Sequence, residues 1–130
     1  MALKIIGDHC AVIAIDIDGV LNDDDESVPM INRIYNDKMI NLLSTLGENG
    51  YTVILYTSRD ISRTRETKEW LSINGFFSGR HYYDIIFNKL KYDVIIDDRA
   101  FNPRCGIGNE TIPKELEEIA HLMDVYLGGQ

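Results

Sequence analysis

Three apolar runs rich in Val, Ile and Leu constrain the fold of this chain more than any other feature. They cover residues 11–16, 51–57 and 92–97 and are apolar on both faces. Such runs are typical of parallel strands that helices cover. Shorter runs at 84–87 and 3–6 predict a weaker strand and an edge strand.

Helical patterns fill the intervals between these runs. Apolar residues recur at helical spacing over 39–46, 62–75 and 111–127, and each stretch predicts a helix. Because strands and helices alternate, we expect an α/β fold with a mostly parallel central sheet, in the form of a Rossmann-like three-layer sandwich. The chain length suits one domain over residues 1–130.

The lengths of the apolar runs, the first residues and the cysteine content indicate in which cellular compartment to expect the protein. No apolar run approaches the roughly 18–20 residues of a membrane span, and the first ten residues lack the pattern of a secretion signal. The two cysteines, Cys10 and Cys105, form neither a disulfide framework nor a metal-binding spacing. We therefore expect a cytoplasmic protein with reduced thiols.

The charge balance narrows the classes of partner. The chain has 21 acidic residues against 13 Lys and Arg, a formal net charge of −8. This charge disfavours attraction to nucleic acid or to anionic lipid, so we expect neither as a partner. Part of the excess is local, in residues 22–26 and in the doublet Asp97–Asp98, where a divalent cation would offset it.

Reactive side chains follow the predicted strands at their carboxyl ends. The first predicted strand ends in Asp16 and Asp18, the second in residues 57–59 and the third in residues 97–99. Lys89 comes directly after the weak strand. Because the carboxyl ends of parallel strands share one edge of a sheet, we expect these groups to meet there.

The order of these motifs resembles the haloacid dehalogenase (HAD) superfamily of phosphotransferases. The sequence DIDGVL at 16–21 matches its first motif, and VILYTSR at 53–59 looks like the second. Lys89 stands where the third-motif lysine belongs, and VIIDD at 94–98 looks like the acidic fourth motif. The resemblance spans residues 11–99 and implies a HAD-type phosphatase.

The chemistry of the first motif agrees with this resemblance. Unpaired carboxylates at the end of a buried run cost several kcal/mol, and Mg²⁺, which prefers hard oxygen ligands, would compensate for that cost. Asp16 is the candidate nucleophile, because its carboxylate could bind the metal and attack phosphorus to give an aspartyl-phosphate. Asp18 lies on the same side of an extended segment and is the candidate acid and base.

The second and third motifs supply candidates for phosphate binding. We expect the hydroxyl of Thr57 to donate to a phosphate oxygen, with Ser58 in the assisting turn. Arg59 is a candidate substrate contact. Lys89 would supply a fixed positive charge. The usual proline after this lysine is replaced by leucine here, which leaves Lys91 as a rival.

The resemblance also implies the metal ligands. The expected ligands of Mg²⁺, or of Mn²⁺ in its place, are Asp16, Asp18, Asp97 and Asp98. By family pattern Asp98 is the direct ligand of the doublet, with Asp97 in support, an order that the sequence itself does not rank. The acidic run 23–26 fits no ligand template and predicts a solvated loop.

The two family insertion points have no room for a cap domain, so we expect an open site. The chain is similar to capless phosphatases of capsular polysaccharide biosynthesis and, second, to the 3′-phosphatase domain of polynucleotide kinase. We expect a small phosphorylated metabolite, such as a sugar phosphate or nucleotide, as substrate, and an open rim is compatible with a homodimer. The alternatives are a 3′-phosphatase on nucleic-acid ends, a phosphoacceptor switch and a non-catalytic scaffold or regulatory protein of the same fold.

Overall fold

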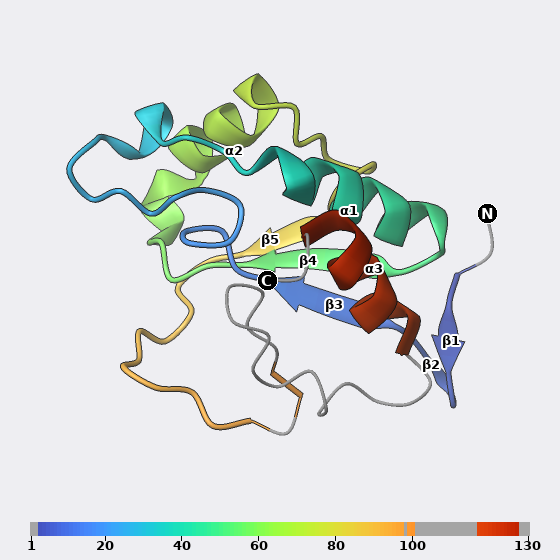
Figure 1. Ribbon diagram of the computed structural model, residues 1–130. Helices are drawn as coiled ribbons and strands as arrows, with labels where there is room; N and C mark the ends of the chain where they lie inside the picture. The colour runs from blue at the N-terminus through green and yellow to red at the C-terminus, as the bar shows by residue number, and fades with distance from the viewer. Residues whose placement is uncertain (1–2, 98, 101–116, 128–130) are drawn as a thin grey trace. The chain divides into compact units, whose positions relative to one another are not determined.

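The structure is a computed structural model that describes residues 3–97, 99–100 and 117–127 (Figure 1). The chain divides into two compact units, Met1–Leu90 and Lys91–Gln130. The prediction of a single domain over the whole chain stays a prediction.

A parallel sheet of three strands forms the centre of the first unit. Its strands are β3 (Val12–Ile15), β4 (Thr52–Tyr56) and β5 (Asp84–Ile86), in the order β3-β4-β5. Both neighbouring pairs are parallel and in continuous register. These strands confirm three of the predicted runs, and the α/β class with them.

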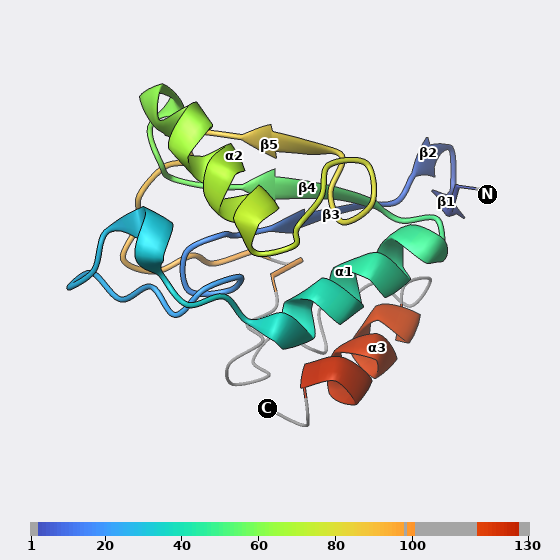
Figure 2. The same cartoon turned by 90° about the horizontal axis from the view of Figure 1, so that it is seen from above.

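Two helices cover one face of this sheet (Figures 1 and 2). Helix α1 (Asp37–Glu48) connects β3 to β4, and helix α2 (Thr64–Ile73) connects β4 to β5. Right-handed crossovers that advance in one direction along a sheet place both helices on the same side. The side chain of Asn36 caps α1 by accepting a hydrogen bond from the Lys38 N–H. The residues that α1 buries are Met39, Leu42, Leu43 and Leu46.

The core of this unit also holds the segment that follows β3. Ile17 and Leu21 of that segment are fully buried, as are Trp70 of α2 and Phe76, whose rings stack with centroids 5.9 Å apart. The short 3₁₀ helix η1 (Met30–Asn32) packs against α2. Burial of these apolar side chains fixes the start of the loop that carries Asp16 and Asp18, because each contributes about 1.5–3 kcal/mol on leaving water.

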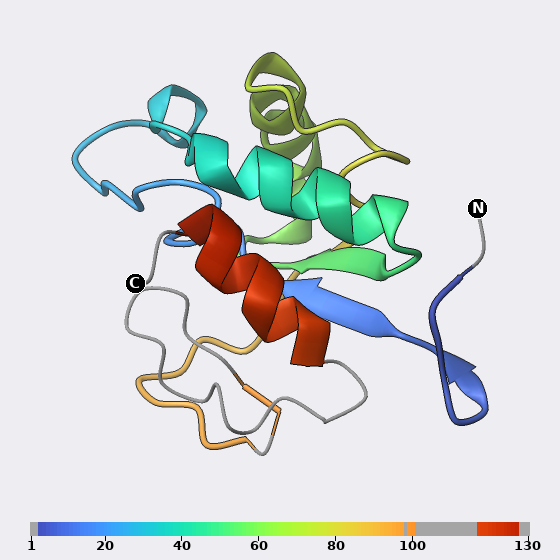
Figure 3. The ribbon, with the colours of Figure 1, turned by 45° about the vertical axis from the view of Figure 1, so that its right-hand side comes forward.

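The predicted edge strand at 3–6 belongs to a separate hairpin. Strands β1 (Ile5–Ile6) and β2 (His9–Cys10) pair antiparallel with each other and not with the three-stranded sheet. Figure 3 shows the hairpin, in dark blue, beyond the start of β3. Gly7 has φ +58°, a conformation that glycine adopts at little cost, and the chain therefore reverses before it can extend along the sheet.

The prediction of a strand at residues 92–97 is wrong. These residues form no strand, and Val94 and Ile96 are 75% and 96% exposed. Only residues 87–91 separate this run from β5, whereas a parallel neighbour in the same sheet requires a crossover of about a dozen residues or more. The apolar composition of the run therefore does not lead to strand pairing here.

The described helix of the second unit is α3 (Glu117–Leu127), which matches the end of the helix predicted at 111–127. The first residues of that prediction, 111–116, lie outside the described part of the chain. Ile119 is 3% exposed, as expected for the apolar side of the helix. Among the described helices, none is both long enough and apolar enough to cross a membrane.

Candidate functional site

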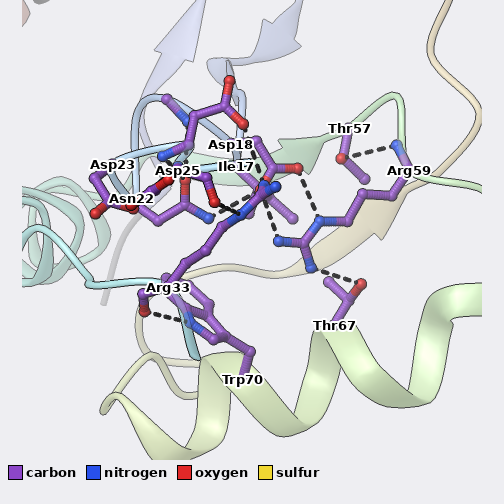
Figure 4. A network of polar contacts seen from close by, with 12 residues as sticks. Ile17, Asp18, Asn22, Asp23, Asp25, Arg33, Thr57, Arg59, Thr67 and Trp70 are labelled. Carbon is purple, nitrogen blue, oxygen red and sulfur yellow. Dashed lines mark hydrogen bonds and ion pairs between the residues drawn. The ribbon is translucent and has the colours of Figure 1, made fainter. Parts of the chain in front are cut away.

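The carboxyl edge of the sheet gathers most of the predicted groups of the first unit. The strands β3, β4 and β5 run in one direction, so the residues after each of them meet at one edge. Figure 4 shows Asp18, which follows β3, facing Arg59, which follows β4. The predicted convergence of these two loops is therefore observed.

Asp16 is the first carboxylate at this edge. Its Oδ1 accepts a hydrogen bond from the Ile17 N–H at 2.8 Å and lies 3.6 Å from Nζ of Lys89. Its side chain is 36% exposed. Burial raises the pKa of Asp16, and the positive charge of Lys89 opposes that rise without cancelling it. Oδ1 of Asp16 thus faces the ammonium group of Lys89 at the exposed rim.

Lys89 reaches Asp16 through the loop after β5. Its backbone N–H donates to the Thr57 carbonyl at 2.9 Å, and its side chain is only 12% exposed. The ammonium lies 5.3 Å from the centroid of the Tyr56 ring, within range of a cation–π contact. Lys91 is exposed and falls in the second unit. The observed partner of Asp16 is therefore Lys89, one of the two lysines left open by the sequence.

Thr57 directly follows β4, and its side chain is enclosed, with 1% exposed. Its Oγ1 accepts a hydrogen bond from the Arg59 N–H at 3.1 Å, an arrangement that shapes the turn through Ser58. A hydroxyl that accepts one bond keeps its own proton for donation. The predicted role of this enclosed hydroxyl in phosphate binding stays a prediction, and Ser58 beside it is half-buried.

Asp18 is held by three side chains at once (Figure 4). Arg59 binds it in a bidentate manner, with Nε 2.8 Å from Oδ2 and Nη2 2.7 Å from Oδ1. Arg33 donates from Nη1 to Oδ1 at 2.9 Å, and Asn22 donates from Nδ2 to the same oxygen at 2.9 Å. Both carboxylate oxygens of Asp18 are therefore engaged by donors.

These donors determine the protonation state of Asp18. Burial alone would raise the pKa of the carboxyl group, but hydrogen bonds from Arg59 and Asn22 and the charges of Arg59 and Arg33 outweigh it. The pKa of Asp18 falls to about 2. At neutral pH this carboxylate is ionised, and it can accept a proton but has none to give.

Arg59, predicted as a substrate contact, faces the interior of the unit. Its side chain is 1% exposed, and Nη1 donates to Oγ1 of Thr67 in α2 at 3.0 Å. A guanidinium group is favourable inside a protein only when its donors are paired, and here they are paired by Asp18 and Thr67. The structure therefore assigns Arg59 to holding Asp18, not to the solvent-facing rim.

Arg33 is a member of the site that the sequence does not reveal. Nη1 also lies 3.1 Å from Oδ1 of Asp24, and Nε donates to the Asp25 carbonyl at 3.2 Å. The Arg33 carbonyl in turn accepts a hydrogen bond from the indole N–H of Trp70 at 2.9 Å. Arg33 thus holds the acidic loop, which was predicted to be solvated, at Asp24 and Asp25. A single arginine after an acidic run gives too weak a sequence signal to predict this contact.

Asn22 is the second residue that the sequence does not reveal. It is 4% exposed, and its Oδ1 accepts from the N–H groups of Gly19 and Asp24 while its Nδ2 donates to Asp18. Gly19 has φ +89°, a conformation that glycine adopts at little cost, so the chain turns sharply directly after Asp18. Asparagine is common in turns for this reason, so its type alone does not distinguish a role beside Asp18.

The described residues supply only part of the predicted metal site. Among them, no three His, Cys, Asp or Glu side chains lie close enough to hold a metal ion. Asp16 fits as a hard oxygen ligand, but both oxygens of Asp18 are engaged by arginine and asparagine. Asp97 falls in the second unit, where Oδ1 accepts from the Arg99 N–H, and Asp98 lies outside the described residues. Asp18 therefore does not fit as a side-chain ligand, and the doublet stays a prediction.

Comparison with known proteins places the chain in a fold class. No family model and no curated protein matches it. A crystal structure described as that of an MCSG target from Vibrio cholerae is similar, with a TM-score of 0.60 and 24% sequence identity over 88% of this chain and 98% of that one. This similarity concerns the fold. The protein is a small α/β protein with a Rossmann-like parallel sheet and a charged rim at its carboxyl edge.

Proposed function

We propose that this protein is a Mg²⁺-dependent phosphomonoester hydrolase that acts through an aspartyl-phosphate on Asp16. The main support is the position of Lys89, whose Nζ lies 3.6 Å from Oδ1 of Asp16 at the exposed edge of the sheet. A cation beside a partly exposed carboxylate suits the binding of a phosphate dianion next to a nucleophile. The order of the four HAD-like motifs supports the same chemistry.

The first chemical step transfers the phosphoryl group to the protein. A carboxylate oxygen of Asp16 forms a bond to phosphorus while the bond from phosphorus to the leaving oxygen breaks. Lys89 and the hydroxyl of Thr57 hold the phosphoryl oxygens as charge develops on them. Mg²⁺, for which Asp16 offers a hard oxygen ligand, would reduce the repulsion between the carboxylate and the phosphate.

The second step releases phosphate. Water attacks phosphorus, the bond to Asp16 breaks, and Asp18 accepts the proton from the attacking water. Asp18 is ionised, but with a pKa of about 2 and donors on both oxygens it is a weak base, so accepting this proton requires the arginine contacts to loosen. Donation of a proton to the leaving oxygen in the first step requires the arginine contacts of Asp18 to loosen, so we expect esters with good leaving groups to react fastest.

The charge of the chain supports a small substrate. With a formal net charge of −8, and with Arg33 and Arg59 both engaged by Asp18, a polynucleotide would find little positive charge for its phosphates. A sugar phosphate, a nucleotide or a similar metabolite presents one phosphomonoester to the rim. The proposed substrate class is therefore a small phosphorylated metabolite.

The test is hydrolysis of an aryl phosphate by the purified chain. Activity should disappear with EDTA and return with Mg²⁺, and Asp16→Asn should lower kcat by at least about a thousandfold. Asp84→Asn is the matched control, because Oδ1 of Asp84, like that of Asp16, accepts the N–H of the following residue at 2.8 Å. Asp84 lies at the amino end of β5, away from the carboxyl edge of the sheet.

Each alternative predicts another result. A phosphoacceptor switch would accumulate a stable phosphoprotein on Asp16 without turnover. A non-catalytic scaffold would leave a broad panel of phosphorylated metabolites unchanged. Equal activity of Asp16→Asn and the parent would falsify the assignment of the nucleophile.

A further inference from the structure

Asn88 has an unusual backbone conformation directly before Lys89. Among the described residues only Asp24 and Asn88 combine a positive φ with a side chain, and the φ of Asn88 is +60°. For most residues the left-handed region costs about 1 kcal/mol or more, and asparagine tolerates it best after glycine. The chain therefore makes a sharp turn at Asn88 that few residue types accept.

Asn88 also connects two loops of the carboxyl edge. Its N–H donates to the Arg59 carbonyl at 2.9 Å, and its Oδ1 accepts the Ile61 N–H at 3.2 Å. Ile61 begins the 3₁₀ helix η2 (Ile61–Arg63), where the first N–H groups have no partner within the helix. The side chain of Asn88 thus satisfies a helix-start donor in the loop that follows β4.

The contacts on either side of Asn88 extend the pairing of β4 with β5 beyond the strands. The Thr57 N–H donates to the Ile86 carbonyl, and the Lys89 N–H donates to the Thr57 carbonyl, both at 2.9 Å. Asn88 adds two more bonds between the same loops. Its N–H donates to the Arg59 carbonyl, and its Oδ1 accepts from the Ile61 N–H. The loop that carries Lys89 is therefore fastened to the loop that carries Thr57 through residues 86, 88 and 89.

The consequence concerns the ammonium group of Lys89. The energy of a charge beside a phosphate depends on distance, and a flexible loop would let the lysine spread over many positions. The left-handed turn at Asn88 directs the chain so that Lys89 returns toward β4, with its Nζ 3.6 Å from Asp16. The left-handed turn and the bond of the Asn88 side chain to Ile61 therefore both restrict the position of the Lys89 ammonium group.

We infer that Asn88 is a positioning residue that fixes Lys89 for phosphate binding. The inference rests on the proposed phosphatase function. Asn88 does not itself need to touch the substrate: its backbone conformation and its bond to Ile61 set the geometry of the neighbouring lysine.

Two substitutions separate the two contributions of Asn88. Asn88→Gly keeps the left-handed turn and removes the side-chain bond, whereas Asn88→Ala removes the bond and also strains the turn. We expect KM for an aryl phosphate and the inhibition constant of inorganic phosphate to rise about threefold in Asn88→Gly and about tenfold in Asn88→Ala. We expect kcat to change by less than about twofold in Asn88→Gly.

Asn49→Ala is the control for a general loss of stability. The Nδ2 of Asn49 donates to the Thr45 carbonyl at 2.8 Å, at the end of α1 near the start of β4, so its loss also removes one exposed asparagine bond. We expect a similar shift in Tm with unchanged KM. If both Asn88 variants keep KM and the phosphate inhibition constant within about twofold of an active parent, the positioning role is wrong while the phosphatase proposal stands. An inactive parent overturns both.

Discussion

Asp16 and Asp18 are two residues apart in the sequence, but their pKa values shift in opposite directions. Asp16 faces one ammonium group at 3.6 Å, and burial raises its pKa. The side chain of Asp18 is less exposed, 20% against 36% for Asp16, yet its pKa falls to about 2 because Arg59, Arg33 and Asn22 hold both of its oxygens. The comparison teaches that the number of donors, not the degree of burial, separates the two carboxylates.

This difference divides the chemical roles. The oxygens of Asp16 face a cation that a phosphate can share, so Asp16 suits a nucleophile. Asp18 is fixed in one orientation and kept ionised by its donors, so a role as base requires those contacts to loosen. The four predictions below change one side of this comparison at a time.

The largest expected effect is the removal of the guanidinium group that holds Asp18. Arg59→Met should lower the free energy of unfolding by about 3 kcal/mol, because it leaves a partly buried carboxylate without its bidentate partner. Urea unfolding measures this value. Arg63→Met is the matched control, since Arg63 is 44% exposed and pairs with Glu66 on the surface, and it should cost less than about 0.5 kcal/mol.

The second prediction changes the Asp16 side. Lys89→Met should lower kcat/KM about a hundredfold and raise the pKa of Asp16, because the charge of Lys89 opposes the effect of burial. Steady-state kinetics and NMR titration of the carboxyl carbon measure the two effects. Lys91→Met should change neither, and an equal loss in both variants would reverse the choice between the two lysines.

The third prediction concerns the stability of the fold at low pH. Because the folded pKa of Asp18 is about 2 against an ordinary value of 3.8, its ionised form stabilises the fold fully above pH 3.8 and loses this effect as the pH falls toward 2. With solvent screening the contribution is about 1–2 kcal/mol. Carboxyl NMR should show Asp16 titrating above 3.8 and Asp18 far below it. Titration of both groups near pH 4 would remove the contrast between them.

The smallest effect comes from the support behind Arg59. Thr67→Val removes the acceptor of the Nη1 bond and keeps the shape of the side chain. It should cost about 1 kcal/mol of stability and raise the pKa of Asp18 slightly, because Arg59 becomes less well held. Unfolding curves and the same NMR titration measure both changes, and no change in either would show that α2 does not support the arginine.

The sequence predicts the sheet better than the network around Asp18. The runs at 11–16 and 51–57 are strong local signals for strands and the run at 84–87 is a weaker one. The rule that parallel strands share a carboxyl edge places Thr57 and Lys89 at the same edge as Asp16. Arg33 and Arg59 are 15 and 41 residues from Asp18. Such contacts depend on the paths of two loops, which no local pattern specifies.

The run at 92–97 fails for a related reason. Its composition favours a strand, but a strand also needs a neighbour whose backbone it can reach. The link 87–91 after β5 is too short for the chain to cross back and pair parallel to the same sheet. The amino-acid composition of the run does not reveal this restriction.

The bond between the indole N–H of Trp70 and the Arg33 carbonyl gives the molecule a built-in optical reporter. Trp70 is the single tryptophan of the chain and is completely enclosed, so its fluorescence emission should lie toward the blue. Any event that releases the Arg33 loop would wet the indole and move the emission to longer wavelength. Ligand titrations could thus follow that loop without an added dye.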